Sequence, residues 1–281
     1  MADALDVRSL WDFGDPKLTE ERFDALLAEV LTQKARSQGL QRRFEDARNT
    51  LEQAKGLLKP DFVRATISYF LELGRVENSS GNRDAARPHF LYALEIAENA
   101  GNEEFLAIDA AHMLGIVEGP AKALDWNQRA IAMAEKATEQ KARNWLGSLY
   151  NNTGWTLYEM GEYEKALDLF ERALAFRKEE GIAGKILIAD YCVGKCLRAL
   201  GKVDDALAIQ LRLEKEADEV GQDGFIYEEI AECLLLKGDP RAAGYFGKAY
   251  DLLSKDAWLM DSEPDRVERL KECSNRSVQT L

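Results

Sequence analysis

The amino-acid sequence predicts an all-α fold, a right-handed superhelical solenoid of about six helix-turn-helix hairpins with a C-terminal capping helix. Three observations lead to this prediction. Apolar residues in the segment 148–179 recur at offsets of three, four and seven on either side of Gly161, which is the pattern of two amphipathic helices. Small residues recur along the whole chain at intervals close to the length of one hairpin. Only six of the 281 residues are proline, as suits a helical chain.

Small side chains mark the positions where the two helices of each hairpin are expected to touch. An alanine marks the second helix, and successive alanines are 36 to 43 residues apart. A small residue also stands eleven or twelve positions before each alanine, and seven positions after all but one of them. Two helix backbones approach closely only where the side chains are small, so this phased set predicts an array of hairpins. The six alanines are Ala47, Ala86, Ala123, Ala166, Ala206 and Ala242.

The order within each unit is a small residue, a large apolar residue, a glycine turn and then Ala-x3-Phe. It is plainest in TGWTLYEMGEYEKALDLFERAL and is also visible in GKCLRALGKVDDALAIQ and AECLLLKGDPRAAGYFGKAY. This order resembles the tetratricopeptide repeat (TPR), over about residues 22–255. The spacing exceeds the 34 residues of the basic repeat, so the chain looks most like the longer kinesin-light-chain type. The resemblance implies a protein- or peptide-binding groove lined by the first helix of each pair.

The chain is expected to begin its repeats at a capped helix. Asp15 is a suitable N-cap, and Pro16 suits the first helical position. Three regions are predicted: an N-terminal cap or loose tail at 1–15, the TPR-like array at 16–255, and a C-terminal capping helix with a frayed tail at 256–281. The hairpins are expected at about 16–57, 61–99, 103–137, from 138 onward, 184–219 and 223–254.

Two hairpins depart from the regular pattern. Pro88 falls within the second helix of the second hairpin, where it is expected to kink the helix or delay its start. In the third hairpin Asn127 stands where an aromatic side chain normally packs, and the neighbouring Trp126 is expected to take over that role.

Charge and composition exclude several kinds of partner. The net charge of −13 argues against nucleic acid as the main ligand, because phosphate contacts need a surface of lysine and arginine. It also disfavours anionic membranes. No run of about 18 apolar residues is present, and the amino end lacks the features of a secretory signal. Four cysteines in a chain of this size indicate a reducing compartment. We therefore expect a cytoplasmic protein with no nucleic-acid or membrane partner.

No catalytic residue, metal site or cofactor is predicted. The two histidines lie in different repeats, and the sequence has no His-Glu-x-x-His, paired CxxC or glycine-rich phosphate loop. Cys192 and Cys196 share a helix face but have no further ligands nearby, which favours a role as small contact residues. Glu228, Glu229 and Glu232 are interpreted as solubilising charges on a solvated face. The chain is therefore not expected to be an enzyme.

The predicted binding site is the concave groove. Residues that directly follow the small residues of the first helices should point into it, and several of them are cationic. Together with aromatic residues one turn away, they predict a groove for an extended acidic peptide, held by charge-assisted contacts and aromatic packing. The resemblance adds two asparagines that would bond the ligand's backbone. The predicted groove residues are Arg36, Arg75, His112, Asn151, Asn152, Trp155, Tyr158, Tyr191, Lys195 and Arg198.

Other interpretations stay open at this level. Mixed polar residues are typical of any solvated helix face, and Trp155 also suits a gap between adjacent hairpins. A receptor for chaperone tails is disfavoured, because Ile188 and Cys192 stand where that clamp has cations. The leading prediction is a non-catalytic scaffold for a protein or peptide. A peptide-sensing signalling regulator and a self-assembling homo-oligomer are the alternatives.

Overall fold

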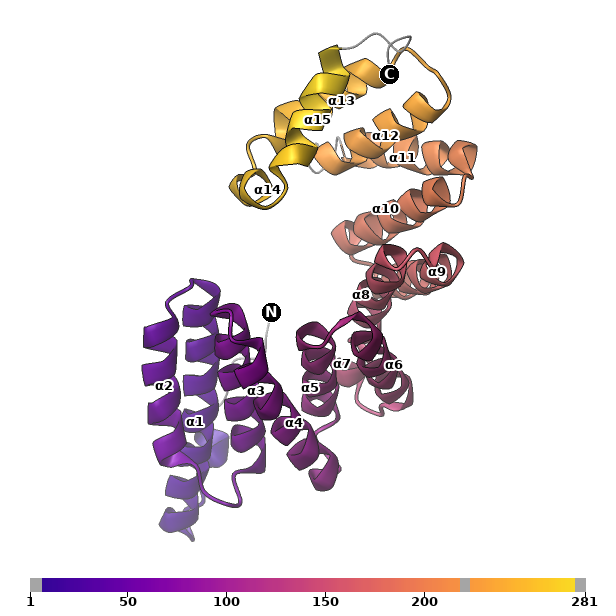
Figure 1. The fold of residues 1–281 in the computed structure, drawn as a ribbon. Helices are drawn as coiled ribbons and strands as arrows, with labels where there is room; N and C mark the ends of the chain where they lie inside the picture. Colours follow the sequence, from indigo (N-terminus) through magenta and orange to yellow (C-terminus); the bar gives the residue numbers. More distant parts are fainter. Residues whose placement is uncertain (1–6, 218–222, 276–281) are drawn as a thin grey trace. The chain divides into compact units, whose positions relative to one another are not determined.

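The structure is a computed structural model that describes residues 7–217 and 223–275 (Figure 1). Every regular element in these two ranges is a helix, and consecutive helices pack against each other in pairs. The predicted all-α array of helix hairpins is therefore confirmed. The chain divides into two compact units, residues 1–149 and 150–281. Parts of the predicted tails, 1–6 and 276–281, lie outside the described residues, as does the end of the fifth hairpin.

The N-terminal unit consists of hairpins stacked in sequence order. Helix α1 packs on α2 and α3, and each helix from α3 to α5 packs on the next. Before α1, the Trp11 ring stacks on Phe13 and meets Phe23 edge to face. The elements are η1 (Val7–Leu10), α1 (Pro16–Leu40), α2 (Phe44–Leu57), α3 (Val63–Ser79), α4 (Arg83–Ala100), α5 (Glu104–Val117), α6 (Pro120–Lys136) and α7 (Gln140–Arg143).

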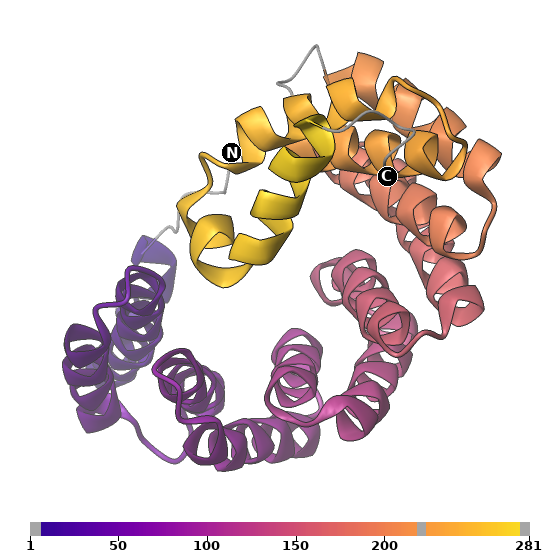
Figure 2. The ribbon, with the colours of Figure 1, turned by 45° about the horizontal axis from the view of Figure 1, so that its top comes forward.

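The C-terminal unit repeats this arrangement. Helices α9 to α13 pack each on the next, and α15 packs on α13 (Figure 2). Helix α8 contains the boundary between the units and supplies most of its residues to this one. The helices are α8 (Leu146–Glu159), α9 (Tyr163–Glu180), α10 (Ala183–Ala199), α11 (Val203–Ala217), α12 (Gly224–Leu236), α13 (Ala242–Leu253), α14 (Ala257–Ser262) and α15 (Pro264–Asn275).

The phased small residues hold each hairpin together. All eighteen phased positions are buried. At Gly154 a Cβ would lie 2.7 Å from the Phe170 ring, so only glycine lets α8 and α9 approach this closely. Gly161 forms the predicted glycine turn between these helices, with a φ of +77°, a left-handed conformation that favours glycine. The Asp15 side chain accepts a hydrogen bond from the Leu18 N–H at 3.0 Å, which confirms the predicted cap of α1.

Two local expectations need correction. Helix α4 begins at Arg83 and runs through Pro88, so the proline does not delay its start. The neighbouring Phe90 is fully buried, and this packing outweighs the loss of one backbone hydrogen bond. In α6 it is Asn127, and not Trp126, that occupies the aromatic position. The Asn127 amide lies directly against Gly115, because it is four residues after Ala123 and shares its helix face.

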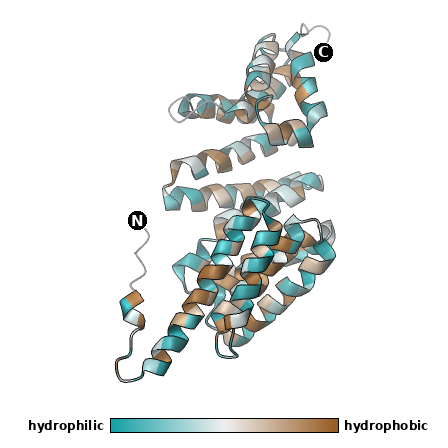
Figure 3. Cartoon of the chain, turned by 90° about the vertical axis from the view of Figure 1, so that its left-hand side faces the viewer, coloured by the Kyte–Doolittle hydropathy of each residue, from teal (hydrophilic) through white to brown (hydrophobic). Residues whose placement is uncertain are grey.

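Polar and apolar residues alternate around the helices. Teal and brown segments follow one another along single helices in Figure 3, as amphipathic helices require. The brown residues include the buried core of the hairpins, and the teal residues leave each helix with a polar face. Within the described residues, no helix has the length and apolar character that crossing a membrane needs.

Candidate functional site

The C-terminal unit contains a pocket of about 500 Å³, here called the C-terminal pocket. Helices α8 and α10 form one part of it, and the residues at the starts of α12 and α15 form the rest. Its apolar lining is Trp155, Tyr158, Leu187, Ile188, Tyr191 and Phe225. Its charged lining is Glu159, Lys195, Asp223, Glu263 and Arg266. A pocket with an apolar wall and a few charges is typical of a ligand site.

The aromatic wall is built on the hairpin contact of α8 and α9. Trp155 follows Gly154 directly, and its ring centroid lies 5.2 Å from that of Phe170 and 5.4 Å from that of Tyr158. Tyr158 in turn lies 5.1 Å from Tyr163. Trp155 therefore packs against the second helix of its own hairpin and also lines the pocket.

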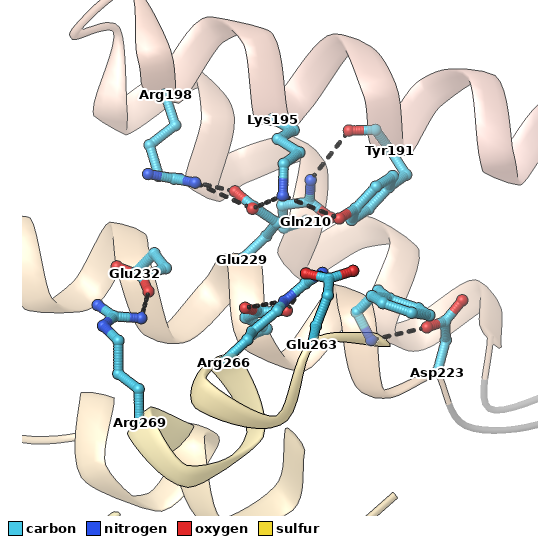
Figure 4. Close-up of polar contacts among 12 residues, drawn as sticks. Tyr191, Lys195, Arg198, Gln210, Asp223, Glu229, Glu232, Glu263, Arg266 and Arg269 are labelled. Atoms are coloured by element: carbon cyan, nitrogen blue, oxygen red, sulfur yellow. Dashed lines mark hydrogen bonds and ion pairs between the residues drawn. The ribbon is translucent and has the colours of Figure 1, made fainter. Parts of the chain in front are cut away.

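Beside this wall, Glu229 binds two cationic side chains of α10 (Figure 4). Its carboxylate accepts from the Lys195 Nζ at 2.7 Å and from two nitrogens of Arg198 at 2.6 and 3.0 Å. Only 1% of the Glu229 side chain is exposed. Burial alone would raise the pKa of Glu229, but the hydrogen bond from Arg198 and the charges of Lys195 and Arg198 outweigh it and lower the pKa. Glu229 is thus an ionised, fully bonded carboxylate.

Helix α15 makes a second set of ion pairs with α12. Arg266 donates to both oxygens of Glu228, at 2.9 and 2.5 Å, and to Glu263 at 3.1 Å. Arg269 pairs with Glu232 (Figure 4). The hydrogen bond to Glu228 is the main reason that the pKa of Arg266 is raised. Both pocket cations, Lys195 and Arg266, are therefore already bound to buried carboxylates.

The N-terminal unit has a smaller hollow of about 130 Å³, here called the N-terminal hollow. Arg36 and Arg75 line it, and both donate to the same oxygen of Glu72, at 3.3 and 2.5 Å. Arg75 also pairs with Asp109 of α5. Within the described residues, the second oxygen of Glu72 and the Nε of Arg75 have no hydrogen-bond partner. Burial raises the pKa of Glu72, although Arg75 and Arg36 act in the opposite direction.

The ten predicted groove residues are distributed over several places. Four of them line the C-terminal pocket: Trp155, Tyr158, Tyr191 and Lys195. Arg198 lies beside it on Glu229, and Arg36 and Arg75 line the N-terminal hollow.

The other three predicted residues line neither cavity. His112 is buried, with its ring 5.3 Å from that of Trp145, and burial lowers the pKa of this histidine. Asn151 accepts from the Cys192 thiol at 3.4 Å and donates to Asn152 at 3.3 Å. The role that the resemblance gives to these asparagines stays a prediction.

Two buried carboxylates beside the pocket and several of its lining residues were missed at the sequence level. Glu228 and Glu229 are buried and ion-paired, so their interpretation as solvated charges was wrong. The sequence does contain a signal for these ion pairs: each carboxylate is 31 to 38 residues from its cation, which is close to the length of one repeat. The spacing continues into α15, where Arg266 pairs back to α12. The remaining missed residues are Glu159, Leu187, Ile188, Asp223, Phe225 and Glu263. Within the described part of the chain, no group of three or more His, Cys, Asp or Glu side chains could hold a metal ion.

Comparison with known families identifies one segment of the repeat array. Residues 120–179 match the family model of the tetratricopeptide repeat. This segment of the chain is therefore similar to that repeat. The matched segment covers α6 to α9 and therefore includes the hairpin in which the sequence pattern is plainest. No curated protein matches the sequence.

Several solved structures have the same fold. One is a signal-transduction ATPase with numerous domains and a tetratricopeptide repeat sensor from Pyrococcus horikoshii, with a TM-score of 0.68 and 20% identity over 90% of this chain. The match spans 41% of that protein's chain.

Two further structures show the same repeat fold. The nearly identical TPR-like repeats of a kinesin light chain from Podosopora anserina match with a TM-score of 0.53 and 15% identity, over 76% of this chain and 98% of that one. A Rap protein complexed with Competence and Sporulation Factor matches with a TM-score of 0.54 and 18% identity, over 91% of this chain and 76% of that one. At these identities the likeness concerns the fold.

Proposed function

We propose that the chain is a non-catalytic, cytoplasmic binding scaffold whose C-terminal pocket holds part of an extended peptide segment of a partner protein. The observation that carries this proposal is the pocket itself. Six apolar side chains from α8, α10 and α12 meet there, and Ile188 is 57% exposed although it is apolar. An exposed apolar side chain at a pocket wall gains free energy when a ligand covers it.

The charge of the ligand needs a different interpretation from the one that the sequence suggested. An acidic peptide was expected because Arg36, Arg75, Lys195 and Arg198 are cations. Each of them is bonded to a buried carboxylate of its own unit. An acidic ligand would have to compete with carboxylates that are already in place, so these cations do not favour it.

A signalling regulator that senses a peptide is compatible with the same pocket. The Pyrococcus structure is described as having a tetratricopeptide repeat sensor, and the Rap structure as a complex with a factor. A self-assembling protein would instead bury Ile188 against a second copy. These alternatives differ in the occupant of the pocket, which can be measured directly.

Selection from a random peptide library displayed on phage tests the proposal. The immobilised chain should enrich peptides, and Ile188→Ser should weaken their binding about tenfold, because an apolar contact is lost. Ile182→Ser is the matched control: it is an exposed isoleucine of the N-cap of α10 that does not line the pocket. Failure to enrich any peptide, or equal binding by Ile188→Ser, would overturn the proposal. So would a dimer in light scattering that Ile188→Ser dissociates.

A further inference from the structure

The charges of the C-terminal pocket specify which peptide it accepts. We infer that the ligand segment carries an apolar side chain next to a basic one, a lysine or arginine. This inference rests on the proposed function, and it reverses the charge expected from the sequence.

The first step is the charge balance of the pocket and its floor. The cations are Lys195, Arg198 and Arg266, and the carboxylates are Glu159, Asp223, Glu228, Glu229 and Glu263. Three positive and five negative charges leave an excess of two negative charges. Because the three cations are bonded to Glu228 and Glu229 underneath, the charges that remain for a ligand are carboxylates at the rim.

Glu159 is the clearest of these rim charges. It is exposed at the end of α8, and its carboxylate has no hydrogen-bond or ion-pair partner among the described residues. One oxygen of Asp223 caps α12 by accepting the Phe225 N–H at 2.8 Å, which leaves its charge without an ion pair in the described part of the chain. A basic ligand side chain would find both of these carboxylates at the same pocket.

The aromatic rings indicate where in the pocket the basic side chain of the ligand would lie. The Lys195 ammonium lies over the Tyr191 ring at 5.8 Å, and the Arg266 guanidinium lies over the Phe225 ring at 5.3 Å. No such cation lies over Trp155 in the described residues, and its helix also carries Glu159 one turn further on. A ligand cation can therefore stack on this aromatic wall while it pairs with Glu159.

The apolar part of the ligand then belongs on the part of the pocket lining that α10 supplies. Leu187 and Ile188 of α10 form an aliphatic surface with no charged group of their own. A leucine or phenylalanine side chain placed there would cover Ile188. The occupant is thus a short segment in which a basic and an apolar residue lie close together.

Two matched pools of fluorescein-labelled short peptides test this inference. Both carry leucine or phenylalanine at the centre; one pool is flanked by Lys, Arg, Ser and Gly, and the other by Asp, Glu, Ser and Gly. Fluorescence anisotropy with the full chain should show tighter binding of the basic pool, and raised salt should weaken it. Glu159→Lys should weaken the basic pool about threefold to tenfold.

Glu179→Lys is the control for net charge, since Glu179 is exposed on α9 and does not line the pocket. Equal weakening by Glu179→Lys and Glu159→Lys would mean that the basic pool binds the net negative charge of the chain, and would overturn the inference. If the acidic pool bound as well or better, and Ile188→Ser still weakened it, only the inference about charge would fail. If neither pool bound, or Ile188→Ser changed nothing, the proposed function would fail as well.

Discussion

Two buried carboxylates, Glu72 in the N-terminal unit and Glu229 in the C-terminal unit, occupy similar places, but their pKa values are shifted in opposite directions. Both lie on the first helix of a hairpin, and both accept hydrogen bonds from cations of the preceding first helix. Their exposure is nearly equal, at 3% and 1%. Nevertheless, burial raises the pKa of Glu72, whereas the bonds from Arg198 and Lys195 lower the pKa of Glu229 against the effect of burial.

The difference lies in how the bonds are distributed. Arg36 and Arg75 share one oxygen of Glu72, and the other oxygen has no partner in the described residues. Asp109 lies nearby and raises the pKa of Glu72 further. At Glu229 both oxygens are bonded. The comparison teaches that two neighbouring cations lower the pKa of a buried carboxylate more effectively when both of its oxygens are bonded than when they share one oxygen.

The largest expected effect comes from Glu229→Gln. The change leaves Lys195 and Arg198 without their buried anion and turns an amide group toward them. We expect the C-terminal unit to lose about 3 kcal/mol of unfolding free energy. Hydrogen exchange measured by mass spectrometry on the full chain would show the loss in peptides from α10 and α12.

The control for this change is Glu268→Gln, which removes an exposed pair with Lys271 on α15. An exposed pair contributes little, so the change should stay within about 0.5 kcal/mol. Equal losses of unfolding free energy in Glu229→Gln and Glu268→Gln would contradict the prediction, because burial would then have no influence on the strength of the ion pairs.

The fold could be predicted because its determinants are local and periodic. A small residue in a fixed phase, such as Gly154 against Phe170, indicates a helix contact without any knowledge of distant residues. Asp15 and Gly161 mark a helix start and a turn by their own chemistry. Two positions depended on tertiary packing: Asn127 takes the aromatic position that was expected for Trp126, and Pro88 does not delay the start of α4.

The candidate site could be predicted only in part. Trp155, Tyr158, Tyr191 and Lys195 follow the helix phase, and the structure brings them to one pocket. The burial of Glu229 depends on cations 31 and 34 residues away, and helix periodicity within one segment does not report such a distance. Phase alone therefore assigned the cations to a ligand, whereas neighbouring repeats already neutralise them.

The next largest expected effect is on the pH dependence of stability, which tests the lowered pKa of Glu229. The folded-state pKa of Glu229 is below the usual 4.5, so its stabilisation is complete above about pH 4.5 and is lost as the pH falls through the folded pKa. The unfolding free energies of wild type and Glu229→Gln should therefore converge when the pH is lowered from about 7 toward 4 and below. Urea unfolding at each pH measures this gap. A constant gap would contradict the lowered pKa of Glu229.

Of the changes at the two buried carboxylates, Glu72→Gln has the smallest expected effect, and it most directly separates the two sites. The pKa of Glu72 is raised, so its stabilising contribution is present below about pH 4.5 and is lost as the pH rises through the folded pKa. A neutral glutamine avoids the burial of a charge, which is the main cause of the raised pKa of Glu72. At pH 7 the variant should therefore stay within about 1 kcal/mol of wild type, or be slightly more stable. Hydrogen exchange in peptides from α3 and α5 measures this change in stability under the conditions used for Glu229→Gln. A loss as large as that of Glu229→Gln would mean that Arg36 and Arg75 satisfy their carboxylate as fully as Arg198 and Lys195 do, and the two sites would then be equivalent.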